Sequence, residues 1–154
     1  MIALSRVDER LIHGQVAFAW TFQYKADAIV VVDAPSANDK MSKSLLEMAC
    51  PRTMKCFVLD EEKSIALLKK YPNKKFFLVA KHPKTFLTLI ENGIEMKSVN
   101  IGGIYYKEGR QQVTNTVFLD DETKEVLHKI HDKGIYLDGR TTPSDAELDL
   151  AKKI

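Results

Sequence analysis

The sequence predicts a single-domain α/β fold, with a mostly parallel open sheet and helices on both faces. Short apolar segments alternate with segments of helical periodicity along the chain. One apolar segment, DAIVVVD (residues 27–33), is rich in β-branched residues and lacks polar alternation, which is typical of a central strand buried on both faces. The 154 residues fit one domain, and no linker or repeat divides them, so we expect one domain over residues 1–154.

The first third of the chain predicts strand, helix, strand and helix. Residues 1–7 (MIALSRV) form the first predicted strand, and residues 14–24 (GQVAFAWTFQY) form a helix that places Val16, Ala17 and Trp20 on one side. After the central strand, residues 36–50 predict a helix that Pro51 ends. The helical spacing there is carried by apolar side chains, Met41, Leu45 and Met48. We expect its second half, KSLLEMAC, to pack in the core.

The rest of the chain continues the alternation. The predicted helices have acidic residues or proline at their starts and lysine or glycine at their ends, as the helix dipole and backbone geometry favour. One of them opens with Asp120 or Asp121 as its N-cap. The predicted strands are residues 54–60, 74–80, 97–103, 111–119 and 134–140, and the predicted helices are residues 61–71, 83–93, 120–134 and 144–154.

Composition excludes several classes of protein. A net charge of +2 gives no support to nucleic-acid binding. No run of 18 apolar residues predicts a membrane span, and no signal peptide is visible at the start. The two cysteines, Cys50 and Cys56, form no CxxC pair, so we expect buried free thiols rather than a disulfide. These features together predict a cytoplasmic protein.

The segment after the first strand holds the strongest chemical signal. Open parallel sheets bind ligands at the carboxyl ends of their strands. There the chain reads SRVDERLIHG, so His13 precedes a helix that starts at Gly14. Unpaired N–H groups at a helix start favour an anion, and the guanidinium groups of Arg6 and Arg10 suit phosphate oxygens. Asp8 can orient the imidazole, which is a nucleophile near neutral pH.

From the residues alone, two interpretations of this segment stay open. His13 either accepts a phosphoryl group or is an ordinary loop histidine. A related alternative is a flavodoxin-like or Rossmann-like domain that binds a nucleotide without covalent chemistry. The chain has no Walker loop, no Ser–His–Asp arrangement and no clear metal cluster, and the glycines of GGIYYKEG (residues 102–109) match neither GxGxxG nor GxxxxGK.

The segment RVDERLIHGQV (residues 6–16) resembles the signature of one protein family. It meets every position of R-[IV]-D-[DE]-R-[LF]-I-H-G-Q-V, the pattern of the IIB component of the mannose/fructose/sorbose class of the bacterial phosphoenolpyruvate-dependent sugar phosphotransferase system. The segments at residues 29–51, 98–122 and 134–145 also resemble this family, so the resemblance covers nearly the whole chain. DAPSAND (residues 33–39) departs from the usual sequence of its loop, which borders the site.

The resemblance implies a phosphoryl carrier. His13 matches the histidine that accepts phosphate, on Nδ1, from a IIA phosphohistidine and passes it to a sugar entering through the membrane subunits IIC and IID. Arg10 matches an arginine that contacts the phosphoryl group. Asp8 matches an aspartate near the incoming donor histidine. The implied fold has an antiparallel edge strand, and neither a cofactor nor a metal is required.

Further residues of the same segment are expected to bind phosphate. Arg6 matches a basic residue of the family's loop, and Gly14 and Gln15 lie at the helix start, where backbone N–H groups face an anion. The roles of Arg6 and of the Gly102–Gly103 pair are not defined by the sequence.

Several properties stay open at this level. The sugar can be mannose, fructose, sorbose or an N-acetylhexosamine, and the chain can be a transporter subunit or a regulatory homologue. Monomer and homodimer are both compatible with the sequence, in which no interface stripe stands out. We expect His82, His128 and His131 to be solvated, and Asp33 to cap the helix that follows it.

Overall fold

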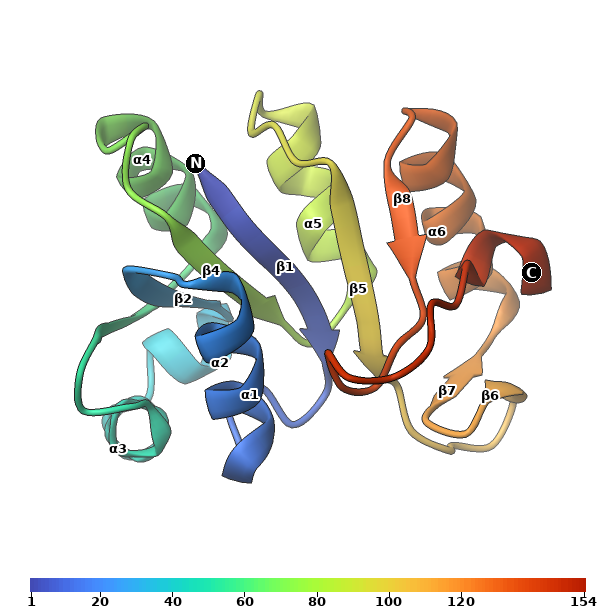
Figure 1. Ribbon diagram of the computed structural model, residues 1–154, viewed down its shortest axis with the longest axis horizontal. Helices are drawn as coiled ribbons and strands as arrows, with labels where there is room; N and C mark the ends of the chain where they lie inside the picture. The colour runs from blue at the N-terminus through green and yellow to red at the C-terminus, as the bar shows by residue number, and fades with distance from the viewer.

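The computed structural model describes all 154 residues and confirms the α/β class. Its main sheet has six parallel strands in the order β3-β2-β4-β1-β5-β8 (Figure 1). The strands are β1 (Ile2–Asp8), β2 (Ala28–Val32), β3 (Lys55–Leu59), β4 (Phe76–Ala80), β5 (Ser98–Gly103) and β8 (Tyr136–Asp138). The α-helices are α1 (Gly14–Tyr24), α2 (Ala34–Ala37), α3 (Lys40–Ala49), α4 (Glu61–Lys70), α5 (Pro83–Glu91) and α6 (Asp121–Asp132).

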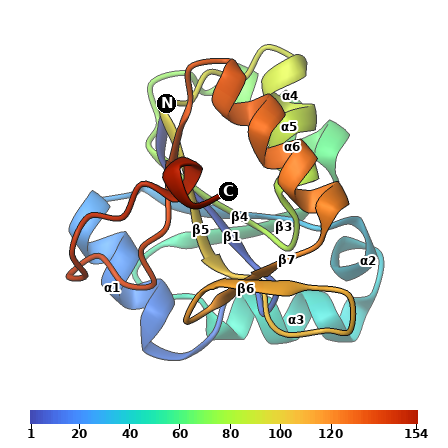
Figure 2. The ribbon, with the colours of Figure 1, turned by 90° about the vertical axis from the view of Figure 1, so that its right-hand side faces the viewer.

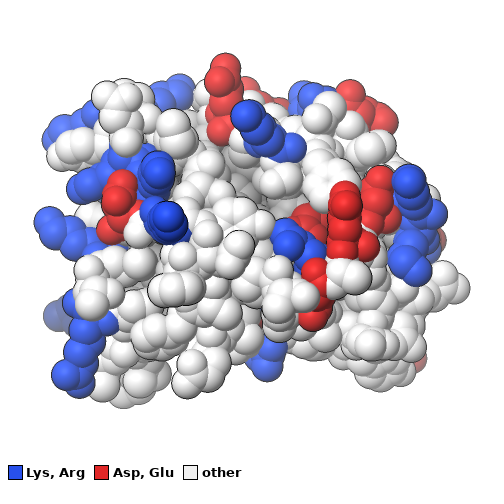
Figure 3. Space-filling model, viewed as in Figure 1, with Lys and Arg blue, Asp and Glu red and all other residues white.

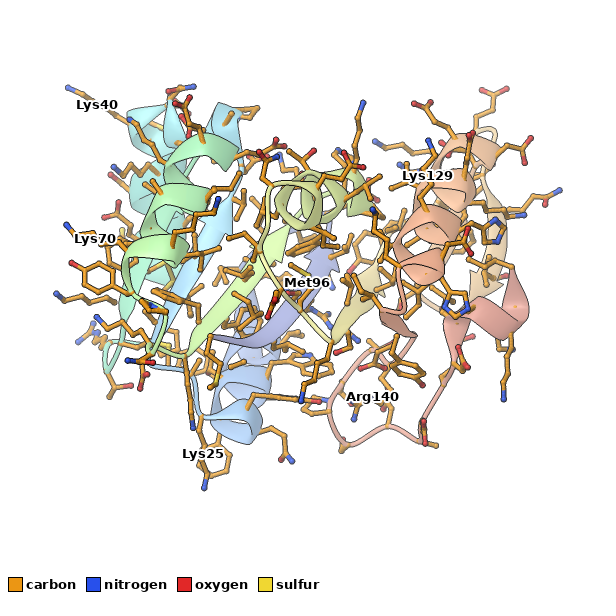
Figure 4. All side chains as sticks on the ribbon, turned by 90° about the horizontal axis from the view of Figure 1, so that it is seen from above. Lys25, Lys40, Lys70, Met96, Lys129 and Arg140 are labelled. Carbon is orange, nitrogen blue, oxygen red and sulfur yellow. A yellow bond between two sulfur atoms is a disulfide. The ribbon has the colours of Figure 1, made fainter.

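The sheet separates two hydrophobic layers. Helix α1 lies on one face of the sheet, and α4, α5 and α6 lie on the other (Figures 2 and 4). The smaller layer contains Trp20 of α1 packed over Leu4, Ile29 and Phe77, and the larger layer lies beneath the other three helices. β2 and β4 are buried along their whole length because both faces are covered.

The helix boundaries follow from their capping residues. Asp120 accepts a hydrogen bond from the N–H of Thr123 and confirms the earlier of the two predicted caps of α6. Asp33 likewise caps α2 through the N–H of Ser36. The predicted bounds of α1, residues 14–24, are confirmed without change. No helix of the structure has both the length and the apolar character needed to cross a membrane.

Residues 111–119 form two strands rather than one. β6 (Gln111–Thr114) and β7 (Val117–Leu119) make an antiparallel ribbon of their own, whereas every pair in the main sheet is parallel. The ribbon adjoins the main sheet where Ile104 pairs with Val117. At the C-terminus the expected helix is a single turn of 3-10 helix, Leu150–Lys153.

The expectation that residues 43–50 pack in the core holds only for Cys50, which is buried, and for Leu46 and Ala49, which pack against the core. No residue of α3 is buried, and the apolar side chains that gave the helical spacing are exposed: Met41 (72%), Leu45 (60%) and Met48 (80%). α3 lies at the carboxyl edge of the sheet, below β3 (Figure 2). Of its apolar side chains, only Leu46 and Ala49 pack against the core. Periodicity locates the apolar face of a helix but does not state what covers it.

The expectation of two free thiols is also wrong. The structure joins Cys50 and Cys56 in a disulfide, with their Cα atoms 6.4 Å apart. Cys50 ends α3 and Cys56 lies in β3, and the turn at Pro51–Met54 brings the helix end back beside the strand. The two cysteines are six residues apart in the sequence, and this spacing alone did not indicate that the chain turns back to bring them together.

Candidate functional site at the carboxyl end of β1

The carboxylate of Asp8 is the centre of a polar cluster at the end of β1. Its side chain is completely buried. Oδ2 accepts hydrogen bonds from Arg6 Nη2 at 3.0 Å and from His13 Nε2 at 3.0 Å. Oδ1 accepts from the backbone N–H of Arg10 at 2.9 Å and from the hydroxyl of Tyr105 at 3.3 Å. Each carboxylate oxygen therefore has two donors, as a buried charge requires.

The contact with Asp8 fixes which ring nitrogen of His13 carries the proton in the neutral imidazole. An ionised carboxylate only accepts hydrogen bonds, so Nε2 of His13 must carry the proton. The neutral ring then has its lone pair on Nδ1, which makes no hydrogen bond within the protein. His13 is the N-cap residue of α1 and 22% of its side chain is exposed, so this nitrogen is within reach of an incoming group.

Arg6 lies behind Asp8 rather than beside the solvent. Only 2% of its side chain is exposed. Besides Asp8, Nη1 donates to Asn100 Oδ1 at 2.7 Å and to the carbonyl of Thr141 at 3.1 Å. The guanidinium carbon lies 5.3 Å from the centre of the Trp20 ring. The structure thus brings Arg6 into the cluster but uses its donors on the protein itself.

Arg10 has the opposite placement. Its side chain is 55% exposed, and its Nε is 3.7 Å from Asp8 Oδ1. The guanidinium carbon lies 4.7 Å from the centre of the Tyr105 ring, which makes a cation–π contact. This leaves a cation with free donors on the open side of the cluster.

The Gly102–Gly103 pair leaves room for the side chains of Arg6 and Tyr105. A Cβ atom on Gly102 would overlap the guanidinium of Arg6, and a Cβ atom on Gly103 would overlap the hydroxyl of Tyr105. Both glycines end β5, which pairs with β1 through Arg6↔Asn100 and Asp8↔Gly103. The glycine pair of the sequence is therefore required by the side chains that cross it.

A second carboxylate fixes the segment that carries Tyr105. Glu9 accepts hydrogen bonds from the backbone N–H of Tyr105 at 2.6 Å and from both Nη atoms of Arg110, at 2.9 and 3.1 Å. Arg110 also donates to the carbonyl of Tyr105 at 2.6 Å. Tyr105 is thus held through its backbone by a bidentate ion pair.

The start of α1 completes the site. Gly14 and Gln15 are exposed, and the N–H groups of the first helical turn have no partner within the helix. The His13 side chain makes no capping bond to them. Gly14 has a positive φ of 47°, which favours glycine at this position. These N–H groups follow His13 directly, so the positive end of α1 favours an anion beside the imidazole.

Burial and hydrogen bonding act in opposite directions on the acidic groups. Burial alone would raise the pKa of Asp8, but the hydrogen bonds from His13 and the Arg10 N–H and the charge of Arg6 together lower it. Glu9 follows the same logic, because Arg110 and the Tyr105 N–H lower its pKa against the effect of burial. Burial and the Asp8 charge raise the pKa of Tyr105. Both carboxylates are therefore ionised and Tyr105 is protonated at neutral pH.

Sequence reasoning missed Asn100, Tyr105 and Arg110. All three lie more than 90 residues from the residues they contact at the end of β1, Arg6 for Asn100 and Glu9 for Tyr105 and Arg110. The only signal in the sequence was the glycine pair, which marked a close approach without saying to what. A cavity of about 480 Å³ lies outside the Asp8 cluster and is lined by His82 and Asp120 among others, with Arg110 at its border. No three metal-binding side chains come together in the structure.

Comparisons with known proteins agree with the geometry. Residues 2–154 match the family described as the PTS system sorbose subfamily IIB component. The chain is 36% identical over 156 residues to the sorbose-specific EIIB component of Lacticaseibacillus casei, covering all of this chain and 95% of that protein. It is 36% identical over 159 residues to the mannose-specific EIIAB component of Escherichia coli K12, and spans 49% of the length of that protein.

Solved structures give the same result. The IIB domain of the sorbose permease from Klebsiella pneumoniae superposes with a TM-score of 0.95 at 32% identity, covering 99% of this chain and 95% of that one. The N-acetylgalactosamine-specific IIB component 1 of Escherichia coli superposes with a TM-score of 0.90 at 34% identity, covering 96% and 97% of the two chains.

The two arginines near Asp8 predict different losses of stability. Replacement of the buried Arg6 by Met leaves a buried carboxylate without its cation and should lower the free energy of unfolding by roughly 3–5 kcal/mol. Replacement of the exposed Arg10 by Met should cost less than about 1 kcal/mol. Urea unfolding of both variants and the wild type measures the difference. Equal losses would contradict the assignment of Arg6 as the structural cation.

Asp8 predicts a specific pH dependence. Because its pKa is lowered by folding, its ionised form stabilises the protein above about pH 4, the ordinary aspartate pKa, and this contribution is lost as pH falls through the folded pKa. Asp8→Asn removes this titration. The stability advantage of the wild type over Asp8→Asn should therefore be constant between about pH 5 and about pH 7 and should shrink in more acidic urea titrations. An advantage that grows in acid would show that the pKa of Asp8 is raised.

Proposed function

This chain belongs to the sorbose subfamily of IIB components of the sugar phosphotransferase system, and from that premise we propose that it carries a phosphoryl group on Nδ1 of His13. The donor is a IIA phosphohistidine, and the acceptor is a sugar that the membrane subunits IIC and IID transport. The observation that carries the proposal is the hydrogen bond between His13 Nε2 and Asp8, because it leaves Nδ1 free and nucleophilic.

The proposed transfer is an in-line exchange between two nitrogen atoms. The Nδ1 lone pair of His13 attacks phosphorus while the N–P bond of the donor histidine breaks, so the electron pair of that bond returns to the donor ring. His13 gains positive charge as its N–P bond forms. Asp8, held ionised, stabilises that charge through Nε2–H.

The open side of the cluster supplies the phosphate ligands. Arg10 carries free donors there, and the N–H groups at Gly14 and Gln15 add the positive end of α1. We assign Arg6 a different part from that of a phosphate ligand: it holds Asp8, because its side chain is only 2% exposed and three of its N–H donors are used within the protein. Asp8 likewise acts on the ring of His13 rather than on the donor protein.

Transfer onward follows by the same geometry in reverse. A sugar hydroxyl attacks the phosphorus of phospho-His13, its proton is lost to a base of the sugar site, and the N–P electron pair returns to Nδ1. An exposed carrier histidine suits this role, because donor and acceptor must reach it in turn. We propose that the chain carries out this transfer as a cytoplasmic subunit.

His13→Ala should abolish phosphorylation. The wild type, incubated with phosphoenolpyruvate, Enzyme I, HPr and a IIA of this class, should gain one phosphate of about 80 Da that is stable in base and lost in acid. Mass spectrometry of both proteins checks this, and His82→Ala is the matched control that should gain the phosphate. An equal mass gain in His13→Ala, or none in the wild type, would contradict the proposal and leave a non-covalent binding module as the alternative.

Arg10 and Tyr105 should act as one unit in the transfer. Arg10→Ala should slow transfer by roughly tenfold to a hundredfold with the fold intact, since one charge-assisted contact to phosphate is lost. Tyr105→Leu removes the ring that holds Arg10, so it should slow transfer less and should add little to Arg10→Ala. Quench-flow rates of the two single variants and the double variant measure this coupling. Independent, additive losses would show that Tyr105 does not act through Arg10, and Tyr106→Leu, at an exposed neighbour, serves as control.

A further inference from the structure

The helix that starts at His13 has an unusual surface. None of the eleven residues of α1 is charged, whereas α4 has five charged residues in ten and α6 has six in twelve. On the side away from the core, α1 exposes Gln15, Phe18, Ala19 and Phe22, which recur at helical spacing. We name these four residues the α1 stripe. Figure 3 shows the broad uncharged surface that lies over α1.

The two phenylalanines of the α1 stripe are far from buried. Phe18 is 46% exposed and Phe22 is 86% exposed, although Ala17 and Trp20 on the opposite side of the same helix are buried. No large apolar side chain within α4, α5 or α6 is exposed. Helix α3 exposes Met41, Leu45 and Met48, but α3 follows β2, whereas α1 directly follows His13. An exposed apolar face of this kind marks an interaction surface. The sequence had shown no interface stripe, because it could not say which face of α1 the sheet covers.

The position of the stripe relative to His13 follows from helix geometry. At about 1.5 Å of rise per residue, Phe18 lies about 7.5 Å and Phe22 about 13.5 Å along the axis from His13. A protein that exchanges phosphate with His13 must centre its contact there. A standard interface covers about 800 Å² on each partner, which is a disc of roughly 16 Å radius. Along the helix axis, both phenylalanines therefore lie within the radius of such a footprint.

The charges around the stripe indicate which partner it fits. Arg10 precedes α1 and Lys25 follows it, and both are exposed; Figure 4 shows Lys25 projecting from the end of the helix. No acidic residue lies within the helix to offset them. Cytoplasmic loops of membrane proteins carry an excess of Lys and Arg, so they would be repelled here. A phosphorylated donor protein brings negative charge.

We propose that the α1 stripe is the docking surface for the phosphorylated IIA donor, and that the donor presents an apolar face bordered by acidic residues. This inference rests on the proposed function, since it assumes that a IIA phosphorylates His13. The inference adds the surface of this chain that recognises IIA. It also distinguishes that surface from the one that contacts IIC and IID. Phe18 and Phe22 contribute binding, not chemistry, so they should affect KM rather than kcat.

The experiment measures transfer from phospho-IIA to this chain over a range of chain concentrations. Phe18→Ser and Phe22→Ser should each raise KM roughly tenfold or more with kcat unchanged, because a phenylalanine buried at an interface contributes that much to affinity. Tyr71→Ser is the matched control: it is 41% exposed and lies between α4 and β4, at the amino edge of the sheet. Its KM should equal that of the wild type. Circular dichroism verifies that each variant is folded.

A second arm tests the choice of partner. Variants phosphorylated to completion are mixed with membranes that contain IIC and IID, and sugar phosphate is measured; Phe22→Ser should match the wild type. An unchanged KM for phospho-IIA, or a loss confined to the sugar step, overturns the inference. The inference is also overturned if analytical ultracentrifugation shows that the wild type is a dimer and that Phe22→Ser is a monomer, because the α1 stripe would then be a dimer interface.

These failures are distinguishable from failure of the proposed function. If the wild type takes no phosphate from IIA on His13, the carrier role itself is wrong. If the wild type takes it and both serine variants take it with the wild-type KM, only the docking surface is wrong.

Discussion

A carboxylate buried at the end of a parallel strand determines the arrangement of this site. Asp8 has no exposed surface, and an ionised group in that position is stable only if its oxygens are fully paired. Arg6 provides the charge, and His13 and Tyr105 provide two of the remaining donors. The requirement extends outward: Arg6 needs the amide of Asn100 and the carbonyl of Thr141, and it can reach them only because Gly102 has no side chain. The first strand, β5 and the C-terminal segment are thus joined through one negative charge.

The same charge divides two similar arginines into two functions. Both lie within hydrogen-bonding or ion-pair range of Asp8, yet Arg6 is buried and Arg10 is more than half exposed. The buried cation is immobilised by three acceptors and an aromatic ring, so it defines geometry. Exposed Arg10 has one long ion pair, with Asp8, and a cation–π contact with the Tyr105 ring. Its guanidinium can therefore turn toward a new anion at a small cost in free energy. Sequence proximity alone, in RVDER, assigns both to phosphate.

The sequence predicted what depends on neighbours along the chain. The alternation of strands and helices, the bounds of α1, the cap at Asp120 and the placement of His13 between Asp8 and a helix start all follow from local patterns. What failed depended on distant contacts. Three features could be predicted only by knowing which elements contact one another. They are the exposure of Met41, Leu45 and Met48 on α3, the disulfide between Cys50 and Cys56, and the ion pair between Glu9 and Arg110. The family resemblance supplied the proposed function of His13 but could not indicate that Arg6 is buried.

The placement of Asp8 also bears on how a carrier can both accept and release phosphate. Asp8 contacts Nε2, so it lies on the opposite side of the imidazole ring from a phosphoryl group on Nδ1. The two anions are then separated by the ring, and the charge that the ring gains on phosphorylation lies between them. In the proposed mechanism Asp8 would therefore stabilise the phosphorylated ring without competing with Arg10 and the start of α1 for the phosphate oxygens. Because those proposed ligands are few and exposed, they would hold the phosphate on a shallow surface rather than enclose it, and a partner protein that covers the site would complete the set of donors during transfer.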